Sequence, residues 1–141
     1  MSSPFWQNPV IRMPLAISFG AIAGALSRYY VGLWFKSIAT VDYFAFGTFF
    51  VNITGSFIMG LFITITGEKF INLSPEIIAM IAVGFLGSYT TFSSYELETV
   101  NLLLAGQKQL SVLYWLGSPI LGFISMNLGI WFGKIIIDQF S

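Results

Sequence analysis

Residues 84–95 bring hydroxyl groups and glycines together within an apolar part of the chain. Their sequence, Gly-Phe-Leu-Gly-Ser-Tyr-Thr-Thr-Phe-Ser-Ser-Tyr, contains five Ser/Thr residues and two glycines and carries no charge. The apolar flanks, 77–86 and 97–104, are together long enough to cross a membrane as two half-helices. Irregular backbone at that depth must line a cavity or a protein interface. We therefore predict an ion site at this break.

The composition indicates that the elements carrying this segment lie in lipid. Hydrophobic residues make up 56% of the chain and charged residues only 9%, with a mean hydropathy of +0.82, whereas about a quarter of the residues of a soluble domain are charged. Three charge-free intervals come close to or exceed the roughly 20 residues that a spanning helix needs; they are 43–67, 77–95 and 109–133. A fourth, 13–27, reaches spanning length if Arg28 extends its guanidinium to the headgroup region.

These intervals predict an all-α membrane protein with four transmembrane helices, near 13–35, 45–66, 76–104 and 109–137. The connections are short, so consecutive helices run antiparallel and the chain forms one domain, 1–141. Ser74, Pro75 and Glu76 have the residue types of an N-cap, a first helical position and a first turn. The third helix is therefore predicted to begin there.

The basic residues are divided evenly between the two sides of this arrangement. The side of the termini and the opposite side carry three each: Arg12, Lys69 and Lys134 against Arg28, Lys36 and Lys108. Because the Lys/Arg bias sets the orientation of a membrane protein, an unbiased chain can insert both ways and pair as an antiparallel, dual-topology homodimer. Alternatively, a single residue such as Arg12 decides the orientation.

Asn52 places an amide in the middle of the second predicted span, with Thr48 and Ser56 one turn away on the same face. An amide in hydrocarbon needs hydrogen-bond partners. It can bond to a neighbouring helix, or its NH2 group can donate to a permeating anion, and the sequence leaves both open. On the fourth span, Tyr114 and Ser118 are four residues apart and could form a hydroxyl track.

Several function classes are disfavoured. The chain has no cysteine and no histidine, which removes zinc clusters, thiolate nucleophiles and Ser-His dyads, so an enzyme is not expected. A small dual-topology multidrug exporter would share the size and the charge balance. Such an exporter needs an intramembrane carboxylate, and residues 1–41 contain no Asp or Glu. A structural membrane subunit is a further alternative.

Three sequence blocks, at 20–30, 47–60 and 84–95, resemble the signatures of the CrcB/Fluc family of fluoride channels. The second block contains Val-Asn-x-x-Gly, and the third places Thr-Thr-Phe-Ser after Gly-x-x-Gly. This combination is far more specific than a lone glycine motif, and the resemblance covers essentially the whole chain. It implies a dual-topology homodimer with two pores and a broken third helix. It also implies a structural sodium ion (Na+) at the centre, bound by backbone carbonyls of Gly87 and Thr90 from both subunits.

The same resemblance assigns the fluoride path. Phe92 matches the first of two phenylalanines whose ring edges face the ion, and the second falls on Tyr95, which keeps the aromatic edge and adds a hydroxyl. Gly122 stands where some members carry another hydroxyl. Glu98 matches a glutamate of the family pattern, and the alternative is that Glu98, like Glu96, is a solvated or hydrogen-bonded feature of the helix. The other path residues are Thr48, Asn52, Ser93, Tyr114 and Ser118, with Arg28 in the vestibule.

The function implied by the resemblance is passive, selective fluoride export across the cell inner (plasma) membrane. Fluoride that enters a cell as neutral HF ionises and is trapped, so an exporting channel needs no coupling site. The expected lack of a lone membrane carboxylate agrees with such uncoupled conduction. The expected partners are fluoride, the lipid bilayer and a second copy of the chain, and no nucleic-acid partner is expected.

Overall fold

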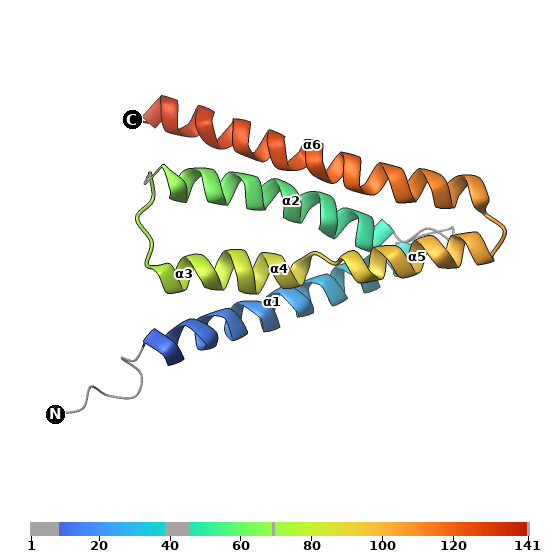
Figure 1. The fold of residues 1–141 in the computed structure, drawn as a ribbon, viewed down its shortest axis with the longest axis horizontal. Coiled ribbons are helices and arrows are strands. Elements are labelled where there is room, and N and C mark those ends of the chain that lie inside the picture. The colour runs from blue at the N-terminus through green and yellow to red at the C-terminus, as the bar shows by residue number, and fades with distance from the viewer. Residues whose placement is uncertain (1–8, 39–45, 69, 141) are drawn as a thin grey trace.

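The computed structural model describes residues 9–38, 46–68 and 70–140, and their regular structure is helical (Figure 1). Three long helices are α1 (Pro9–Ile38), α2 (Phe46–Gly67) and α6 (Lys108–Phe140). A further long segment consists of shorter helices: α3 (Pro75–Ala79), the π-helix η2 (Met80–Leu86), α4 (Gly87–Tyr89) and α5 (Phe92–Leu104).

Four segments are long and apolar enough to cross a membrane, namely Val10–Ile38, Phe46–Gly67, Pro75–Leu104 and Lys108–Phe140. This confirms the prediction of an all-helical chain with four spans. The first helix begins at Pro9 rather than near residue 13, because proline is well tolerated in a first turn. The predicted start of the second span at residue 45, the connection at 39–45 and Lys69 lie outside the described residues.

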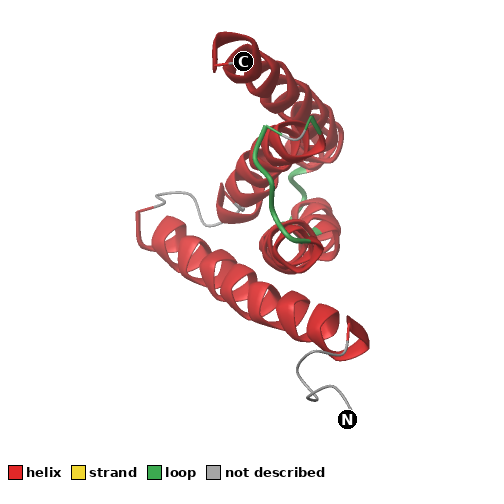
Figure 2. Cartoon of the chain, turned by 90° about the vertical axis from the view of Figure 1, so that its left-hand side faces the viewer, coloured by secondary structure: helices red, strands yellow, loops and turns green. Residues whose placement is uncertain are grey.

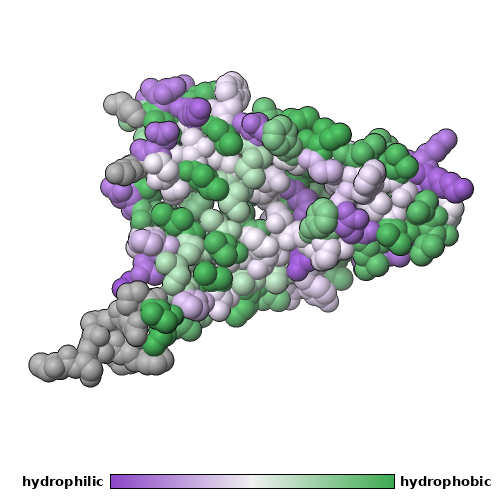
Figure 3. Space-filling model, in the orientation of Figure 1, coloured by the Kyte–Doolittle hydropathy of each residue, from purple (hydrophilic) through white to green (hydrophobic). Residues whose placement is uncertain are grey.

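Consecutive segments run antiparallel, so that α1 begins and α6 ends at the same end of the molecule (Figure 1). Helix α2 packs mainly against α6, and α1 packs mainly against η2. In the perpendicular view, α1 and α6 lie on opposite sides of the other segments (Figure 2). The face shown in Figure 3 is mostly pale to hydrophobic along its middle, with a few hydrophilic residues there, and further hydrophilic residues lie at the two ends of the long axis. This distribution suits a bundle whose ends reach the two membrane surfaces.

Glycines allow the close contact between α1 and η2. A Cβ atom at Gly20 would overlap the carbonyl oxygen of Met80, and one at Gly84 would overlap the carbonyl oxygen of Ile17. Small residues at such positions let helix backbones approach one another in a membrane. This contact anchors the first half of the third segment, which leads into the candidate site.

The third segment begins as predicted. Ser74 is the N-cap, its Oγ accepts a hydrogen bond from the amide of Ile77 at 3.4 Å, and Pro75 is the first helical residue. Glu76 in the first turn forms an ion pair with Arg12 of α1 at 3.1 Å. The start of this segment is thus tied to the first turns of α1.

Candidate functional site

The candidate site begins at two residues with extended backbone, Thr90 and Thr91, between α4 and α5. Their φ/ψ angles are −83°/156° and −152°/120°. Thr91 is also the N-cap of α5, because its Oγ1 accepts a hydrogen bond from the amide of Ser94 at 3.3 Å. Since regular helical bonding stops at these residues, the backbone amide and carbonyl of Thr91 need partners from another element.

Asn52 of α2 supplies both partners. Its Oδ1 accepts from the Thr91 amide at 2.8 Å, and its Nδ2 donates to the Thr91 carbonyl at 3.1 Å. Because the Thr91 amide can bond only to an acceptor, this pairing fixes the orientation of the Asn52 side chain. The interhelical bond predicted as one alternative for Asn52 is therefore present. The second Nδ2 proton is not used by this pairing.

The bonds that Asn52 Oδ1 and Thr91 Oγ1 accept also leave two backbone carbonyls without their helical donors. In a continuous helix, the amide of Thr91 would bond to the carbonyl of Gly87, and by the same spacing the amide of Ser94 would bond to that of Thr90. These amides donate instead to Asn52 Oδ1 and Thr91 Oγ1. Carbonyls of unwound backbone are the ligands that Na+ takes in membrane proteins. Gly87 and Thr90 therefore fit a sodium ion in their ligand chemistry.

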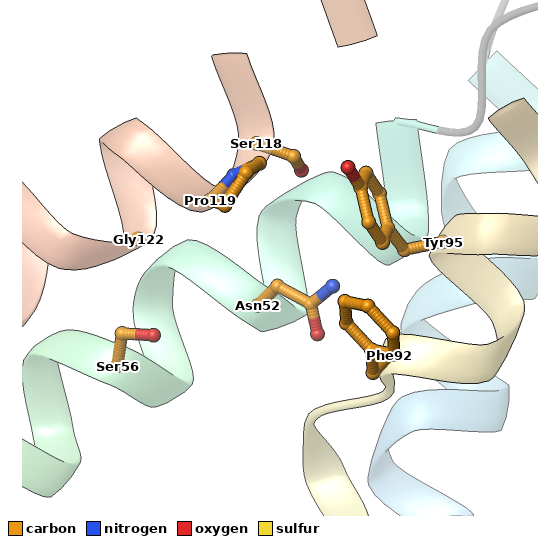
Figure 4. Close-up of a pocket in the computed structure, with 7 residues that line it drawn as sticks. All are labelled: Asn52, Ser56, Phe92, Tyr95, Ser118, Pro119 and Gly122. Carbon is orange, nitrogen blue, oxygen red and sulfur yellow. The ribbon is translucent and has the colours of Figure 1, made fainter. Parts of the chain in front are cut away.

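A cavity of about 180 Å³ lies beside the Asn52 amide (Figure 4). Helices α2, α5 and α6 contribute its wall. The lining residues are Asn52, Ser56, Phe92, Tyr95, Ser118, Pro119 and Gly122. All of them are uncharged, so the cavity offers neutral dipoles and aromatic rings to a ligand.

Ser118 contributes an unsatisfied hydroxyl to this cavity. The residue is 5% exposed, and within the described part of the chain its Oγ has no hydrogen-bond partner. A buried hydroxyl without a partner carries a free-energy cost that a bound acceptor removes. The hydroxyl track predicted on α6 is thus represented in the cavity by Ser118, and Gly122 continues the wall without a hydroxyl.

Three aromatic rings are in contact next to the cavity. The ring centroid of Tyr95 lies 5.5 Å from that of Phe92 and 5.4 Å from that of Tyr114. Tyr95 is 4% exposed, whereas Phe92 is 73% exposed. The Tyr95 hydroxyl donates to the backbone carbonyl of Trp115 on α6, so this hydroxyl is already engaged within the protein.

Glu98 joins two residues that the resemblance assigned to the path. Thr48 Oγ1 donates to one carboxylate oxygen at 2.6 Å, and the Tyr114 hydroxyl donates to the other at 2.7 Å. Glu98 is half-buried and lies inside the segment Pro75–Leu104, so the expectation that the spans carry no lone carboxylate is wrong. Its position three residues after Tyr95, on the same face of α5, is the sequence signal that identifies it as a neighbour of the site.

The remaining predicted residues lie outside the cavity wall. Ser93 is exposed, and Arg28 is half-buried on α1; neither lines the cavity. Ser56 and Pro119 do line it, although the sequence assigned neither to the path. The one-turn spacing between Ser56 and Asn52 was a usable signal, whereas nothing in the local sequence marks Pro119 as part of a site.

Comparison with known proteins identifies the family. The family model described as CrcB-like protein, Camphor Resistance (CrcB), matches residues 15–130. The chain is 51% identical over 129 residues to the fluoride-specific ion channel FluC of Trichormus variabilis, a match that covers 92% of this chain and 93% of that protein. It is 44% identical over 128 residues to the fluoride-specific ion channel FluC of Synechococcus sp., with 91% and 97% covered. The chain therefore belongs to the CrcB family.

Proposed function

We propose that the protein is a channel that conducts fluoride passively across the inner (plasma) membrane and thereby exports it from the cell. Relatives that match more than nine-tenths of the chain carry the name fluoride-specific ion channel, which supports a channel rather than an enzyme. The observation that carries the proposal is the uncharged cavity in which Ser118 keeps an unpaired hydroxyl and which the Asn52 amide also lines.

Hydrogen-bond donors account for how this cavity receives an anion. The Ser118 hydroxyl and the second Nδ2 proton of Asn52 can both donate to fluoride. Neither donor is charged, so binding is favourable enough for entry without the deep trap that a Lys or Arg would create. The pairing of Asn52 with Thr91 matters here because it engages the acceptor Oδ1 and one Nδ2 proton, and leaves the second Nδ2 proton to donate to an anion.

Aromatic ring edges add a second attraction. The edge of an aromatic ring carries the positive part of its quadrupole, so Phe92 and Tyr95 can attract an anion without a formal charge. Both rings border the cavity. Together with the donors from α2 and α6, they give an anion partners on several sides of the path.

The proposed working unit is an antiparallel, dual-topology homodimer with two pores. The equal division of Lys and Arg between the two sides supports insertion in both orientations. The exposure of Phe92, an aromatic residue that borders the cavity, supports a second subunit that covers it. The extended backbone at Thr90 and Thr91 supports a functional break in the third helix of each subunit.

The proposal includes a structural sodium ion at the centre of this dimer. The released carbonyls of Gly87 and Thr90 from both subunits are oxygen ligands suited to a hard cation. When bound, the ion supplies positive charge that holds the two breaks together. The residues of this chain position the carbonyls, chiefly through the bond between Asn52 Oδ1 and the Thr91 amide.

Replacing Phe92 with Ile tests the fluoride path. The substitution removes the aromatic edge and keeps an apolar side chain, so fluoride efflux should fall at least about tenfold, which corresponds to about 1.4 kcal/mol in the barrier. Efflux is measured with a fluoride electrode on liposomes that contain equal amounts of folded protein. Phe123→Ile is the matched control, because Phe123 is 72% exposed and lies outside the cavity wall. Equal efflux from the two variants would show that Phe92 does not line the fluoride path.

Added lysines test the dual topology. Two lysines inserted after Lys36, or beside Lys69, bias the charge toward opposite sides and should each impose a single orientation. Each variant expressed alone should lose fluoride transport, and co-expression of the two should restore it. Full activity of either biased variant by itself would rule out the antiparallel dimer.

Thermal unfolding of the purified protein in sodium or potassium salt tests the ion site. An ion that binds only the folded protein stabilises it by about 2.7 kcal/mol at a hundredfold excess over its Kd, so sodium should raise the unfolding temperature. Asn52→Leu should abolish this rise, because the Thr91 amide becomes available to the Gly87 carbonyl. Asn127→Leu is the control, since Asn127 is an exposed amide bonded only to its own helix at Phe123 in the described structure. Equal unfolding temperatures of the unmodified protein in both salts would refute the sodium site.

A further inference from the structure

Pro119 interrupts the hydrogen bonding of α6 at the wall of the cavity. It lies inside the helix Lys108–Phe140 and lines the cavity next to Ser118. Proline has no amide hydrogen, so the carbonyl four residues earlier loses its helical donor. That carbonyl belongs to Trp115. In a membrane-spanning helix such a carbonyl needs a donor from a neighbouring element, because lipid offers none.

Tyr95 of α5 provides that donor. Its hydroxyl bonds to the Trp115 carbonyl, and Figure 4 shows the hydroxyl end of the ring directed away from Phe92 and toward α6. The ring itself is 4% exposed and is in contact with Phe92 and Tyr114. A tyrosine hydroxyl has a single proton, so a hydroxyl engaged with Trp115 cannot also donate to an anion.

We propose that Tyr95 and Pro119 form a matched pair in which the proline frees the Trp115 carbonyl and the tyrosine hydroxyl binds it. The pair holds the Tyr95 ring at the cavity wall, with its edge rather than its hydroxyl available to the ion. Pro119 is thereby a positioning residue that acts through Trp115 and Tyr95. The effect of the pair on transport rests on the proposed fluoride conduction, whereas the pairing itself rests only on the contacts of α5 and α6.

The pair explains how a tyrosine serves at a position where the family resemblance leads us to expect phenylalanine. A buried hydroxyl without a partner would be costly beside the apolar rings, and a proline-freed carbonyl without a partner would be equally unfavourable. Each residue satisfies the group that the other introduces. Removing the tyrosine hydroxyl alone leaves the Trp115 carbonyl without a donor. Removing both residues leaves no unpaired group, because alanine at 119 restores the helical amide. Pro119→Ala alone also leaves none, because a carbonyl oxygen has two lone pairs and can accept from the amide and the hydroxyl together.

A double-mutant cycle tests the pair. The full-length protein, Tyr95→Phe, Pro119→Ala and the double variant are compared for unfolding temperature and for fluoride efflux per folded dimer. Loss of one neutral hydrogen bond changes an equilibrium or rate constant by about fivefold. Tyr95→Phe should therefore slow efflux about fivefold and lower the unfolding temperature. The double variant should recover both quantities to the level of Pro119→Ala. If Tyr95→Phe does not fold, recovery of folding in the double variant supports the pair in the same way.

Tyr89→Phe, alone and combined with Pro119→Ala, is the matched control. Tyr89 is also buried, and its hydroxyl lies 3.2 Å from Thr54 Oγ1 rather than at a proline-freed carbonyl. Its effects should therefore add to those of Pro119→Ala. If the effects of Tyr95→Phe and Pro119→Ala also add, the pair is overturned. If the two substitutions are coupled in unfolding temperature but Tyr95→Phe leaves fluoride efflux unchanged, the positioning role is overturned. Absence of fluoride efflux from the unmodified protein would refute the proposed function and this role, while the coupling in unfolding would still test the pairing.

Discussion

The structure depends on how the backbone of Thr91 is satisfied inside a membrane-spanning segment. Lipid offers no hydrogen-bond partners, so each unpaired amide or carbonyl at that depth costs several kcal/mol. The Asn52 side chain meets both needs at once through its Oδ1 and Nδ2 atoms. One amide on α2 thus allows extended backbone between α4 and α5, orients its own second proton, and leaves the Gly87 carbonyl without its helical donor. The Thr91 hydroxyl does the same for the Thr90 carbonyl by accepting from the Ser94 amide.

A second substitution of a side-chain partner for a backbone partner occurs at the cavity, and side chains nearby also pair with one another. The proline in α6 frees the Trp115 carbonyl, and Tyr95 binds it. Glu98 accepts from Thr48 on α2 and Tyr114 on α6, and so joins three elements through one carboxylate. These bonds engage the hydroxyls of Tyr95 and Tyr114. The hydroxyl of Ser118 and the second amide proton of Asn52 are then the donors best placed to meet an anion in a wall without charge.

The sequence predicted the elements better than it predicted their contacts. Charge-free intervals and the Ser74 cap located the four spans and the start of the third, because both signals are local. The family resemblance identified Asn52, Phe92, Tyr95 and Ser118, which do surround one cavity. The partners of Asn52 and Glu98 could not be predicted, since helical periodicity specifies a face without specifying what packs on it. Thr91 lies 39 residues from Asn52, and the partners of Glu98 lie 50 residues away at Thr48 and 16 residues away at Tyr114. The role of Pro119 was likewise hidden, because it depends on a hydroxyl from another helix.

Ion efflux from liposomes that contain only the purified, unmodified protein tests the central claim most directly. Liposomes loaded with equal concentrations of fluoride and chloride are made permeable to potassium, and both anions are followed with selective electrodes. The account predicts rapid release of fluoride while chloride stays inside, because the cavity offers small neutral donors and ring edges without a charged residue. Retention of fluoride, or release of chloride at a similar rate, would contradict it.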